Sequence, residues 1–346
     1  MKYAVSLSFA LILTLLWQPA MACTVMRLSY GDRLLIARNH DWGTGGGLLI
    51  VNPRGISKKA ITPVNPAEWT SKYGSVSFAQ FGREIPFAGM NEKGLTVDLL
   101  QLTTASFPPA TSGKPSVNVV QWVQYQLDTA ATVGEVLASL ERIDPMPFIA
   151  VLEKVHYFVT DAEGNAAIIE YLDGKPVVQH NPELGCVLAN STWEDSATAV
   201  KQNQARNGSE QRFVRARQLT QVQQSDAPVD DAIRALRQVA QAHTQWGIVY
   251  ETQSLLITFR TRTALRPRRI DLKDLDFEAN AEVLCVDINV DLEGDVTPHL
   301  EPFTKEANRR IIDDAFDAIL PPGFVRATVK EMVLNYGESL RPVGAK

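Results

Sequence analysis

The chain opens with a short apolar segment that ends beside a cysteine, and this feature constrains the protein more than any other. Lys2 provides a positive start, an apolar run from Ala4 to Trp17 follows, and Pro19 ends it. Residues 20–22 read Ala-Met-Ala, which matches the small-x-small pattern of a signal peptidase site. We therefore expect residues 1–22 to be a cleaved export signal and Cys23 to become the first residue of the protein that remains.

Cleavage at this point gives Cys23 two reactive groups, a thiol and a free α-amino group with a pKa of about 7.7–8.0. A thiol beside an amine that can accept its proton is a self-contained nucleophile and base. Two alternatives stay open. Cys23 could carry a lipid, although Ala20 and Met21 do not fit the usual lipoprotein signal, or it could be a structural cysteine paired with Cys186 or Cys285.

The composition describes an ordinary globular protein after cleavage. The remaining 324 residues (346 − 22) suffice for one large domain, with 45% hydrophobic and 21% charged residues in the full chain. The net charge of −5 becomes −6 without Lys2, so no basic face indicates nucleic acid as a partner. No later apolar run spans a bilayer. We expect an exported protein, periplasmic or secreted, without membrane attachment after cleavage.

The remaining cysteines and the histidines give little sign of a cofactor. If Cys23 is catalytic, only Cys186 and Cys285 can form a disulfide, and their apolar surroundings favour buried free thiols instead. Five scattered histidines and the absence of a Cys-x-x-Cys pattern provide no metal-ligand spacing. We expect neither a metal nor another cofactor.

Strand-like and helix-like segments alternate in blocks along the chain. Turns rather than long crossovers join many strands, which predicts antiparallel sheets. Thr132 and Glu135 form a capping box at a helix start. No linker divides the chain, so we expect one α+β domain over residues 23–346, with helices on both faces of packed sheets. Expected strands include 24–29, 33–38, 94–102, 156–160, 186–190 and 248–252; expected helices include 116–128, 132–142, 210–223, 229–243, 305–320 and 325–335.

A cysteine nucleophile needs a cation near the thiol, a carboxylate near its amine and two donors for the oxyanion. Residues 24–38 predict a hairpin that returns Arg38 and Asp41 to Cys23, although a surface ion pair is an alternative for these two. Asn190 ends an apolar strand and can donate through its amide, or simply form a turn. Arg212 is a further cation, or a charge on a helix surface. A glycine-rich loop at residues 43–47 is expected to rim the site, because no phosphate-binding Lys-Ser/Thr follows.

Five motifs occur in order along the chain: Cys23-Thr24, Arg38-Asn39-x-Asp41-Trp42, Asn91-Glu92-Lys93-Gly94-Leu95, Val187-Leu188-Ala189-Asn190-Ser191 and Arg212-Phe213-Val214-Arg215. Together they resemble those of the choloylglycine hydrolase family, which includes penicillin V acylases and bile salt hydrolases. The resemblance spans essentially the whole chain after residue 22, and it implies the αββα four-layer sandwich of the N-terminal nucleophile hydrolases.

The resemblance also implies a role for each matching residue. Cys23 matches the nucleophile, and Arg38 and Asp41 match the pair that flanks it. Asn190 matches an oxyanion-hole amide, and Arg212 matches an arginine in the family's Ser-Arg-Phe motif, where this chain has Gln211 in place of the serine. The reaction implied is hydrolysis of a linear amide in a small acylated amine.

Two departures from the family pattern affect the expected substrate and assembly. The second oxyanion position falls at Gln101, where bile salt hydrolases have Asn and many penicillin V acylases have Tyr, so it does not identify the substrate. Only 21 residues separate Asn190 from Arg212, where many relatives carry a longer segment that helps to form a tetramer. This shortening and the export signal resemble the Gram-negative branch, and the resemblance implies a homo-oligomer, a tetramer in the family.

The same branch includes penicillin V acylases that also act on N-acyl homoserine lactones, and this implies quorum quenching as an activity. We expect penicillin V acylase-like chemistry first, with conjugated bile salts as the alternative substrate and a non-catalytic lipoprotein as the alternative class. Trp42 is expected to line the acyl pocket, although a core position suits it equally well.

Overall fold

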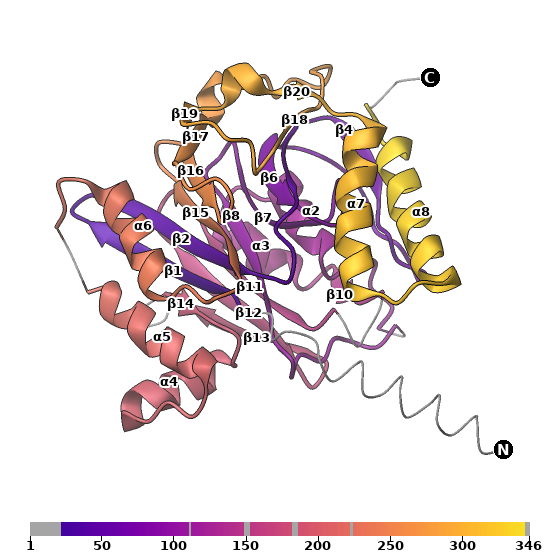
Figure 1. Ribbon diagram of the computed structural model, residues 1–346. Helices are drawn as coiled ribbons and strands as arrows, with labels where there is room; N and C mark the ends of the chain where they lie inside the picture. Colours follow the sequence, from indigo (N-terminus) through magenta and orange to yellow (C-terminus); the bar gives the residue numbers. More distant parts are fainter. Residues whose placement is uncertain (1–21, 111, 149–152, 182–185, 222–223, 343–346) are drawn as a thin grey trace, which may run out of the picture.

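The computed structural model describes residues 22–110, 112–148, 153–181, 186–221 and 224–342. The expected export signal therefore lies outside the described residues, apart from Ala22. Two large sheets form the centre of the molecule, and helices flank both (Figure 1). This arrangement confirms the α+β class expected from the sequence, with two layers of strands between layers of helices.

The first sheet has seven strands in the order β14-β1-β2-β15-β16-β17-β19, antiparallel except for the β17–β19 pair. Its β1–β2 hairpin confirms the predicted one, and Gly31 provides the positive φ (64°) that its turn needs. Thr24 pairs with Asn39, so Cys23 lies beside the end of β2. The strands are β1 (Thr24–Tyr30), β2 (Arg33–Asp41), β14 (Val187–Leu188), β15 (Thr244–Glu251), β16 (Leu256–Thr261), β17 (Arg268–Asp271) and β19 (Gly294–Asp295).

The second sheet has nine strands in the order β13-β12-β11-β8-β7-β6-β3-β18-β20, with every neighbouring pair antiparallel. The side chain of Asn91 accepts hydrogen bonds from the backbone of Lys93 and Leu95 and so forms the predicted turn before β8. The strands are β3 (Leu48–Asn52), β6 (Ser75–Ala79), β7 (Pro86–Asn91), β8 (Thr96–Gln101), β11 (Val155–Thr160), β12 (Ala166–Leu172), β13 (Lys175–His180), β18 (Leu284–Asp287) and β20 (Glu301–Pro302).

Seven described α-helices cover the outer faces of these sheets. Helix α6 contacts β2 and β15, α5 contacts β1, and α2 contacts β7 and β8. Helices α7 and α8 pack against each other (Figure 1). The helices are α2 (Gln121–Thr129), α3 (Val133–Ser139), α4 (Trp193–Gln202), α5 (Gly208–Leu219), α6 (Pro228–Gln238), α7 (Lys305–Ile319) and α8 (Phe324–Ser339), with 3-10 turns at Leu272–Asp274 and Thr297–His299. Among the described residues, no helix is both long and apolar enough to cross a bilayer.

Two large apolar clusters hold these layers together. Successive side chains of a strand point to opposite faces of its sheet, so one strand can contribute to both clusters. On β8, Leu100 faces the core between the sheets, while Val97 and Leu99 face the cluster formed with α2, α3, α7 and α8. The inner cluster also takes in Phe213 of α5 and Leu236 of α6. Helices α7 and α8 thus pack over the outer face of the second sheet.

The structure corrects one expected helix position and contains one helix that was not expected. The predicted helix over residues 116–128 begins instead as strand β9 (Ser116–Asn118), which pairs with β10 (Asp144–Met146) before α2 starts. Helix α4 was not predicted. The predicted start at residue 132 is confirmed, because the Thr132 hydroxyl accepts from the Glu135 backbone and the Glu135 carboxylate accepts from Ala131.

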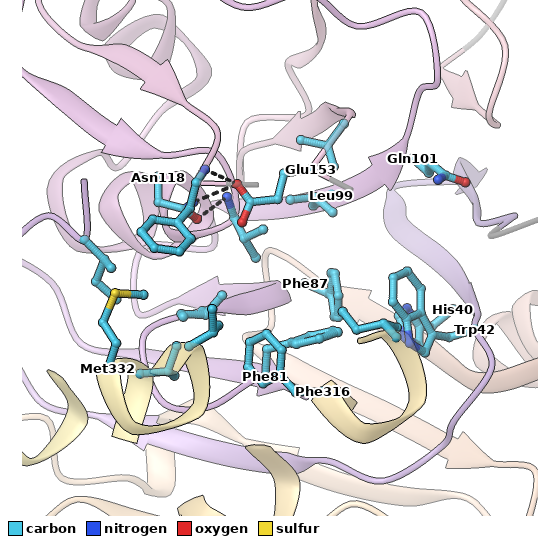
Figure 2. Close-up of a pocket in the computed structure, with 18 of the residues that line it drawn as sticks. His40, Trp42, Phe81, Phe87, Leu99, Gln101, Asn118, Glu153, Phe316 and Met332 are labelled. Atoms are coloured by element: carbon cyan, nitrogen blue, oxygen red, sulfur yellow. Dashed lines mark hydrogen bonds between the residues drawn. The ribbon is translucent and has the colours of Figure 1, made fainter. Parts of the chain in front are cut away.

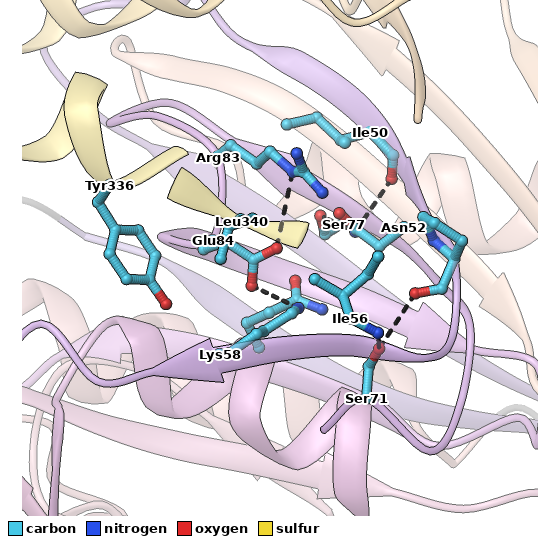
Figure 3. Close-up of polar contacts among 12 residues, drawn as sticks. Ile50, Asn52, Ile56, Lys58, Ser71, Ser77, Arg83, Glu84, Tyr336 and Leu340 are labelled. Atoms are coloured by element: carbon cyan, nitrogen blue, oxygen red, sulfur yellow. Dashed lines mark hydrogen bonds and ion pairs between the residues drawn. The ribbon is translucent and has the colours of Figure 1, made fainter. Parts of the chain in front are cut away.

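A buried charge cluster fixes the segment between β6 and β7 to the rest of the fold (Figure 3). Lys58, on β4 (Ile56–Lys59), places its Nζ 2.5 Å from a Glu84 oxygen and 2.8 Å from an Asp128 oxygen of α2. Strand β4 belongs to a small sheet with β5 (Glu68–Thr70) and β21 (Arg341–Pro342). Glu84 has a positive φ of 72°, a strained conformation that this ion pairing holds in place. The same segment carries Phe81 and Ile85, which line the pocket described below.

Candidate active site

Cys23 lies at the start of β1, buried with 4% of its surface exposed. Its Sγ is 3.9 Å from Nη2 of Arg38 and 4.0 Å from Nδ1 of His40. Asp41 is also near enough for its charge and its backbone N–H to affect the pKa of the thiol. The hairpin therefore brings Arg38 and Asp41 to Cys23, as expected from the sequence.

Arg38 is fully buried, which corrects the alternative that it forms a surface ion pair with Asp41. Its carboxylate partner is Asp98, with Nη1 3.1 Å from Oδ1. Nη1 also donates to the Phe87 carbonyl (2.6 Å), and Nη2 donates to the Leu99 carbonyl (3.0 Å). Burial raises the pKa of Asp98 to about 6, although the Arg38 charge opposes this shift. These contacts fix the guanidinium beside the sulfur.

Burial raises the pKa of the Cys23 thiol, and this effect outweighs the Arg38 charge, which lowers it. The Asp41 charge raises the pKa further, whereas the Asp41 backbone N–H and the Arg212 charge lower it. Burial therefore favours the thiol, while two nearby cations favour the thiolate.

The Asp41 carboxylate lies at the end of β2, where it accepts hydrogen bonds from the Thr244 hydroxyl and from Gln241 Nε2, 3.5 Å away. Burial raises its pKa, and the hydrogen bond from Thr244 counteracts the shift. The side chains of Thr244 and Gln241 therefore orient this carboxylate. The bond from Asp41 to a free α-ammonium group stays a prediction.

Arg212 of α5 joins three parts of the site. Its Nη1 donates to the Cys23 carbonyl (2.6 Å) and the Thr24 hydroxyl (2.7 Å), and its Nη2 donates to Asn190 Oδ1 (2.9 Å). Asn190 Nδ2 donates in turn to the Gln101 carbonyl (2.8 Å). Because the arginine can only donate and the carbonyl can only accept, the amide orientation of Asn190 is fixed. One Nδ2 hydrogen remains for a substrate oxygen.

Gln101, the last residue of β8, lies where a second donor is needed. The next residue, Leu102, donates its N–H to Lys154 across the strand pair. Donors alternate sides along an antiparallel strand, so the N–H of Gln101 points away from β11, on the side where its carbonyl meets Asn190. The geometry suits a backbone donor at Gln101, whose role as an oxyanion donor stays a prediction.

An apolar pocket with a cavity volume of about 100 Å³ extends from Cys23. Figure 2 shows the side chains that line it. His40 and Trp42 lie together at one end, and Met332, Asn118 and Glu153 lie toward the other. Trp42 lines this pocket as expected, within a cluster of aromatic rings. The apolar and aromatic side chains of the lining are Trp42, Ile61, Phe81, Ile85, Phe87, Leu99, Val120, Phe148, Val155, Phe316, Ile319, Val329, Met332 and Val333.

Several polar residues of the site were not identified from the sequence. His40 and Asp98 contact the sulfur and Arg38, and His156 donates through Nε2 to the Ala189 carbonyl (2.8 Å), next to Asn190. His156 Nδ1 also lies 3.0 Å from Glu170, so both ring nitrogens face acceptors. The available signal for His40 was its position, because it is the ionisable residue between Arg38 and Asp41. The others are brought in by distant strands without a local pattern.

The other two cysteines do not take part in this site. Cys186 lies in the core between the sheets and Cys285 beside β3 and α7, and both are buried free thiols, as the sequence favoured. Within the described ranges, no three His, Cys, Asp or Glu side chains are grouped as metal ligands.

Comparisons with known proteins agree with this geometry. The chain is 33% identical over 183 residues to a penicillin V acylase from Pectobacterium atrosepticum, a match that spans about half the length of each protein (48% of both). Its structure superposes on a penicillin V acylase from Agrobacterium tumefaciens with a TM-score of 0.70 and 26% identity, covering 82% of this chain and 98% of that one.

A more distant structure shares the fold. A mutant of a conjugated bile acid hydrolase from Clostridium perfringens superposes with a TM-score of 0.62 and 19% identity, over 76% of this chain and 96% of that one. The model of the linear amide C–N hydrolases of the choloylglycine hydrolase family matches residues 23–230, which is more than half of the chain. This chain therefore belongs to the choloylglycine hydrolase family of linear amide C–N hydrolases.

Proposed function

We propose that this protein hydrolyses the amide bond of a small N-acylated amine, with Cys23 as the nucleophile and its own α-amino group as the base. One observation carries the proposal. Cys23 lines an apolar pocket, and Arg212 connects the Cys23 carbonyl to the amide of Asn190, which it fixes in a donating orientation. A thiol, an acyl pocket and an oriented oxyanion donor are the parts that amide hydrolysis requires.

The reaction follows from these positions. The sulfur attacks the amide carbonyl while its proton passes to the α-amino nitrogen, and the carbonyl oxygen takes the negative charge. Asn190 Nδ2 and the Gln101 N–H stabilise that oxygen, and loss of one such donor typically costs about 10²–10³ in rate. The α-ammonium then protonates the leaving amine, and a water molecule activated by the same amine hydrolyses the thioester. The Arg38 charge favours the developing thiolate.

The lining of the pocket supports an apolar acyl group. The rings of Trp42, Phe81 and Phe87 lie 5.4–5.8 Å apart in tilted and edge-to-face pairs, which suits a further aromatic ring. This lining suits a phenoxyacetyl group, as in penicillin V. Two of the similar proteins are named penicillin V acylases, which supports the same choice. Beyond the rings, aliphatic side chains of α7 and α8 continue the pocket, and they suit the fatty chain of an N-acyl homoserine lactone.

We also propose that the protein is exported, to the periplasm or medium, and begins at Cys23 when active. The apolar run and the Ala-Met-Ala sequence before Cys23 support cleavage there. The short segment between Asn190 and Arg212 supports placement in the Gram-negative branch of the family.

Intact-mass measurement and an activity panel test both proposals. We expect the exported protein to lack residues 1–22, to carry no lipid, and to release 6-aminopenicillanate from penicillin V and homoserine lactone from long-chain acyl derivatives. A Cys23→Ala variant provides the background rate. Glycine release from a conjugated bile salt that exceeds 6-aminopenicillanate release would contradict the substrate class, and a diacylglyceryl group on Cys23 would exclude catalysis.

A further inference from the structure

His40 lies within 4.0 Å of the sulfur, and the reaction described above leaves it without a role. Its protonation follows from its neighbour Gln80. Gln80 Nε2 faces the carbonyls of Thr44 (2.8 Å) and Gly46 (3.1 Å), which can only accept, so the nitrogen must point there. Gln80 Oε1 therefore faces His40 Nε2, 3.3 Å away, and requires a proton on that nitrogen.

With its proton on Nε2, a neutral His40 carries a lone pair on Nδ1. This atom lies 3.3 Å from Arg38 Nη2 and 4.0 Å from Cys23 Sγ. Nη2 has two hydrogens, and the Leu99 carbonyl takes one of them at 3.0 Å. The second hydrogen lies between His40 Nδ1 and the sulfur, which is 3.9 Å from Nη2. The imidazole and the sulfur therefore compete for a single Arg38 hydrogen.

The surroundings hold the ring in this neutral, accepting state. His40 is buried with 1% of its surface exposed, and it stacks on Trp246 with ring centroids 4.2 Å apart. Burial lowers its pKa well below the usual value, and the Arg38 charge lowers it further. A doubly protonated ring would place an N–H against the Arg38 guanidinium. The ring can thus accept a hydrogen bond at Nδ1, but it does not hold a second proton at neutral pH.

We propose that His40 is a positioning residue that holds the Cys23 nucleophile as a thiol until substrate arrives. When its single Nδ1 lone pair accepts the S–H of Cys23, the thiol is stabilised directly. When the lone pair accepts the Arg38 hydrogen instead, the sulfur loses the donor that would stabilise a thiolate. This role rests on the proposed function of Cys23. A thiol reacts with oxidants and alkylating agents more slowly than a thiolate, so His40 protects the nucleophile between turnovers.

Other charged groups also act on this sulfur, and their contributions must stay constant in any test. They come from β2, α5, β8 and β15 in addition to the terminal amine. The groups that face Cys23 or its neighbour Arg38 are Arg38, Asp41, Arg212, Asp98 and Tyr250.

The pH dependence of Cys23 alkylation tests the proposal. Protein that begins at Cys23 is treated with iodoacetamide between pH 5 and 10, and mass spectrometry of the Cys23 peptide separates it from Cys186 and Cys285. In His40→Leu the thiol loses its acceptor, so we expect the midpoint to fall by about half to one pH unit, the worth of one hydrogen bond. In His40→Asn, Oδ1 replaces Nδ1 as an acceptor, and the midpoint should stay at the wild-type value.

Equal midpoints for wild type and a folded His40→Leu variant would overturn the proposal, as would an Asn variant that shifts as far as the Leu variant. Thermal unfolding checks that each variant folds. If His40→Leu does not fold, His40→Met carries the test, because a thioether is only a weak acceptor, and the midpoint should also fall. An unchanged midpoint in that variant would also overturn the proposal. Alkylation needs no turnover, so this result is independent of whether penicillin V is a substrate.

Discussion

Replacement of Asn190 by aspartate isolates the oxyanion donor, because the change keeps the shape of the side chain. Asn190 Oδ1 accepts from Arg212, and Nδ2 donates to the Gln101 carbonyl. In Asn190→Asp the first contact becomes a charge pair, while the second places two acceptors 2.8 Å apart. The variant therefore loses the hydrogen that would meet the substrate oxygen.

The expected loss follows from counting hydrogens. Nδ2 carries two, and one is already committed to Gln101, so the substitution removes one oxyanion donor. We expect kcat for amide hydrolysis to fall by about 10²–10³, which is roughly 2.7–4 kcal/mol, with little change in KM. The new charge pair with Arg212 and the lost bond to Gln101 act in opposite directions, each by about 1–3 kcal/mol, so the free energy of unfolding should change little.

The assay measures kcat and KM for penicillin V hydrolysis alongside urea unfolding of each variant. Cys23 alkylation at fixed pH reports whether the nucleophile stays intact. Asn203→Asp makes the same chemical change at an exposed helix end and should leave kcat unchanged. A kcat for Asn190→Asp within threefold of wild type, in a folded protein, would refute the assignment of this amide to the oxyanion.

Three further predictions concern other parts of the structure. Cys23→Ser should have residual amidase activity near zero, since a hydroxyl is a far poorer nucleophile beside an amine of this basicity. Lys58→Met should lower the free energy of unfolding in urea by about 3–5 kcal/mol, because it leaves Asp128 buried without a partner cation and Glu84 with Arg83 alone, 3.7 Å away. Asp98 has a pKa of about 6 in the folded protein and 3.8 ordinarily, so the folded protein binds its proton more tightly than the unfolded chain. Its stabilising effect is present below about pH 4 and is lost as the pH rises to about 6, and Asp98→Asn should flatten that slope.

Each of these predictions has a control. Near-normal hydrolysis by Cys23→Ser would contradict the nucleophile assignment. Lys59→Met removes a lysine whose partner, Glu68, is exposed, and should cost under about 1 kcal/mol; equal losses at positions 58 and 59 would show that burial does not decide the effect. For Asp98, parallel stability–pH curves for wild type and variant between pH 4 and 6 would exclude the predicted linkage.

The sequence predicted the local parts of the site well. The hairpin from Thr24 to Asp41 alternates apolar residues and contains a Gly-Asp turn, so its register and the approach of Arg38 to Cys23 follow from short-range rules. The turn at Asn91 and the helix start at Thr132 likewise depend on side chains a few residues apart. Such features depend on residues close together in the sequence, so they can be predicted from the sequence alone.

The parts that failed depend on contacts between distant segments. The helical spacing of apolar residues at positions 119, 120, 123 and 127 was extended back to residue 116, but pairing with Asp144–Met146 gives Ser116–Asn118 a strand conformation. The Arg38–Asp98 pair joins positions 60 residues apart across two sheets, and neither residue has a local signature of burial. Helix α4 was missed because its apolar pattern is weak. The available signal was its N-cap, where the Thr192 side chain accepts a hydrogen bond from the Asp195 backbone.

One part of the pocket wall comes from a different part of the chain than the reacting groups. The proposed catalytic residues lie between Cys23 and Arg212, inside the region that the family model matches, whereas Phe316, Ile319, Val329, Met332 and Val333 belong to α7 and α8, beyond its end at residue 230. Selectivity for the acyl chain can therefore drift through changes in the two terminal helices while the bond-breaking apparatus stays constant. A chimera that exchanges only this helical pair should inherit its donor's preference among acyl chains and keep its own chemistry.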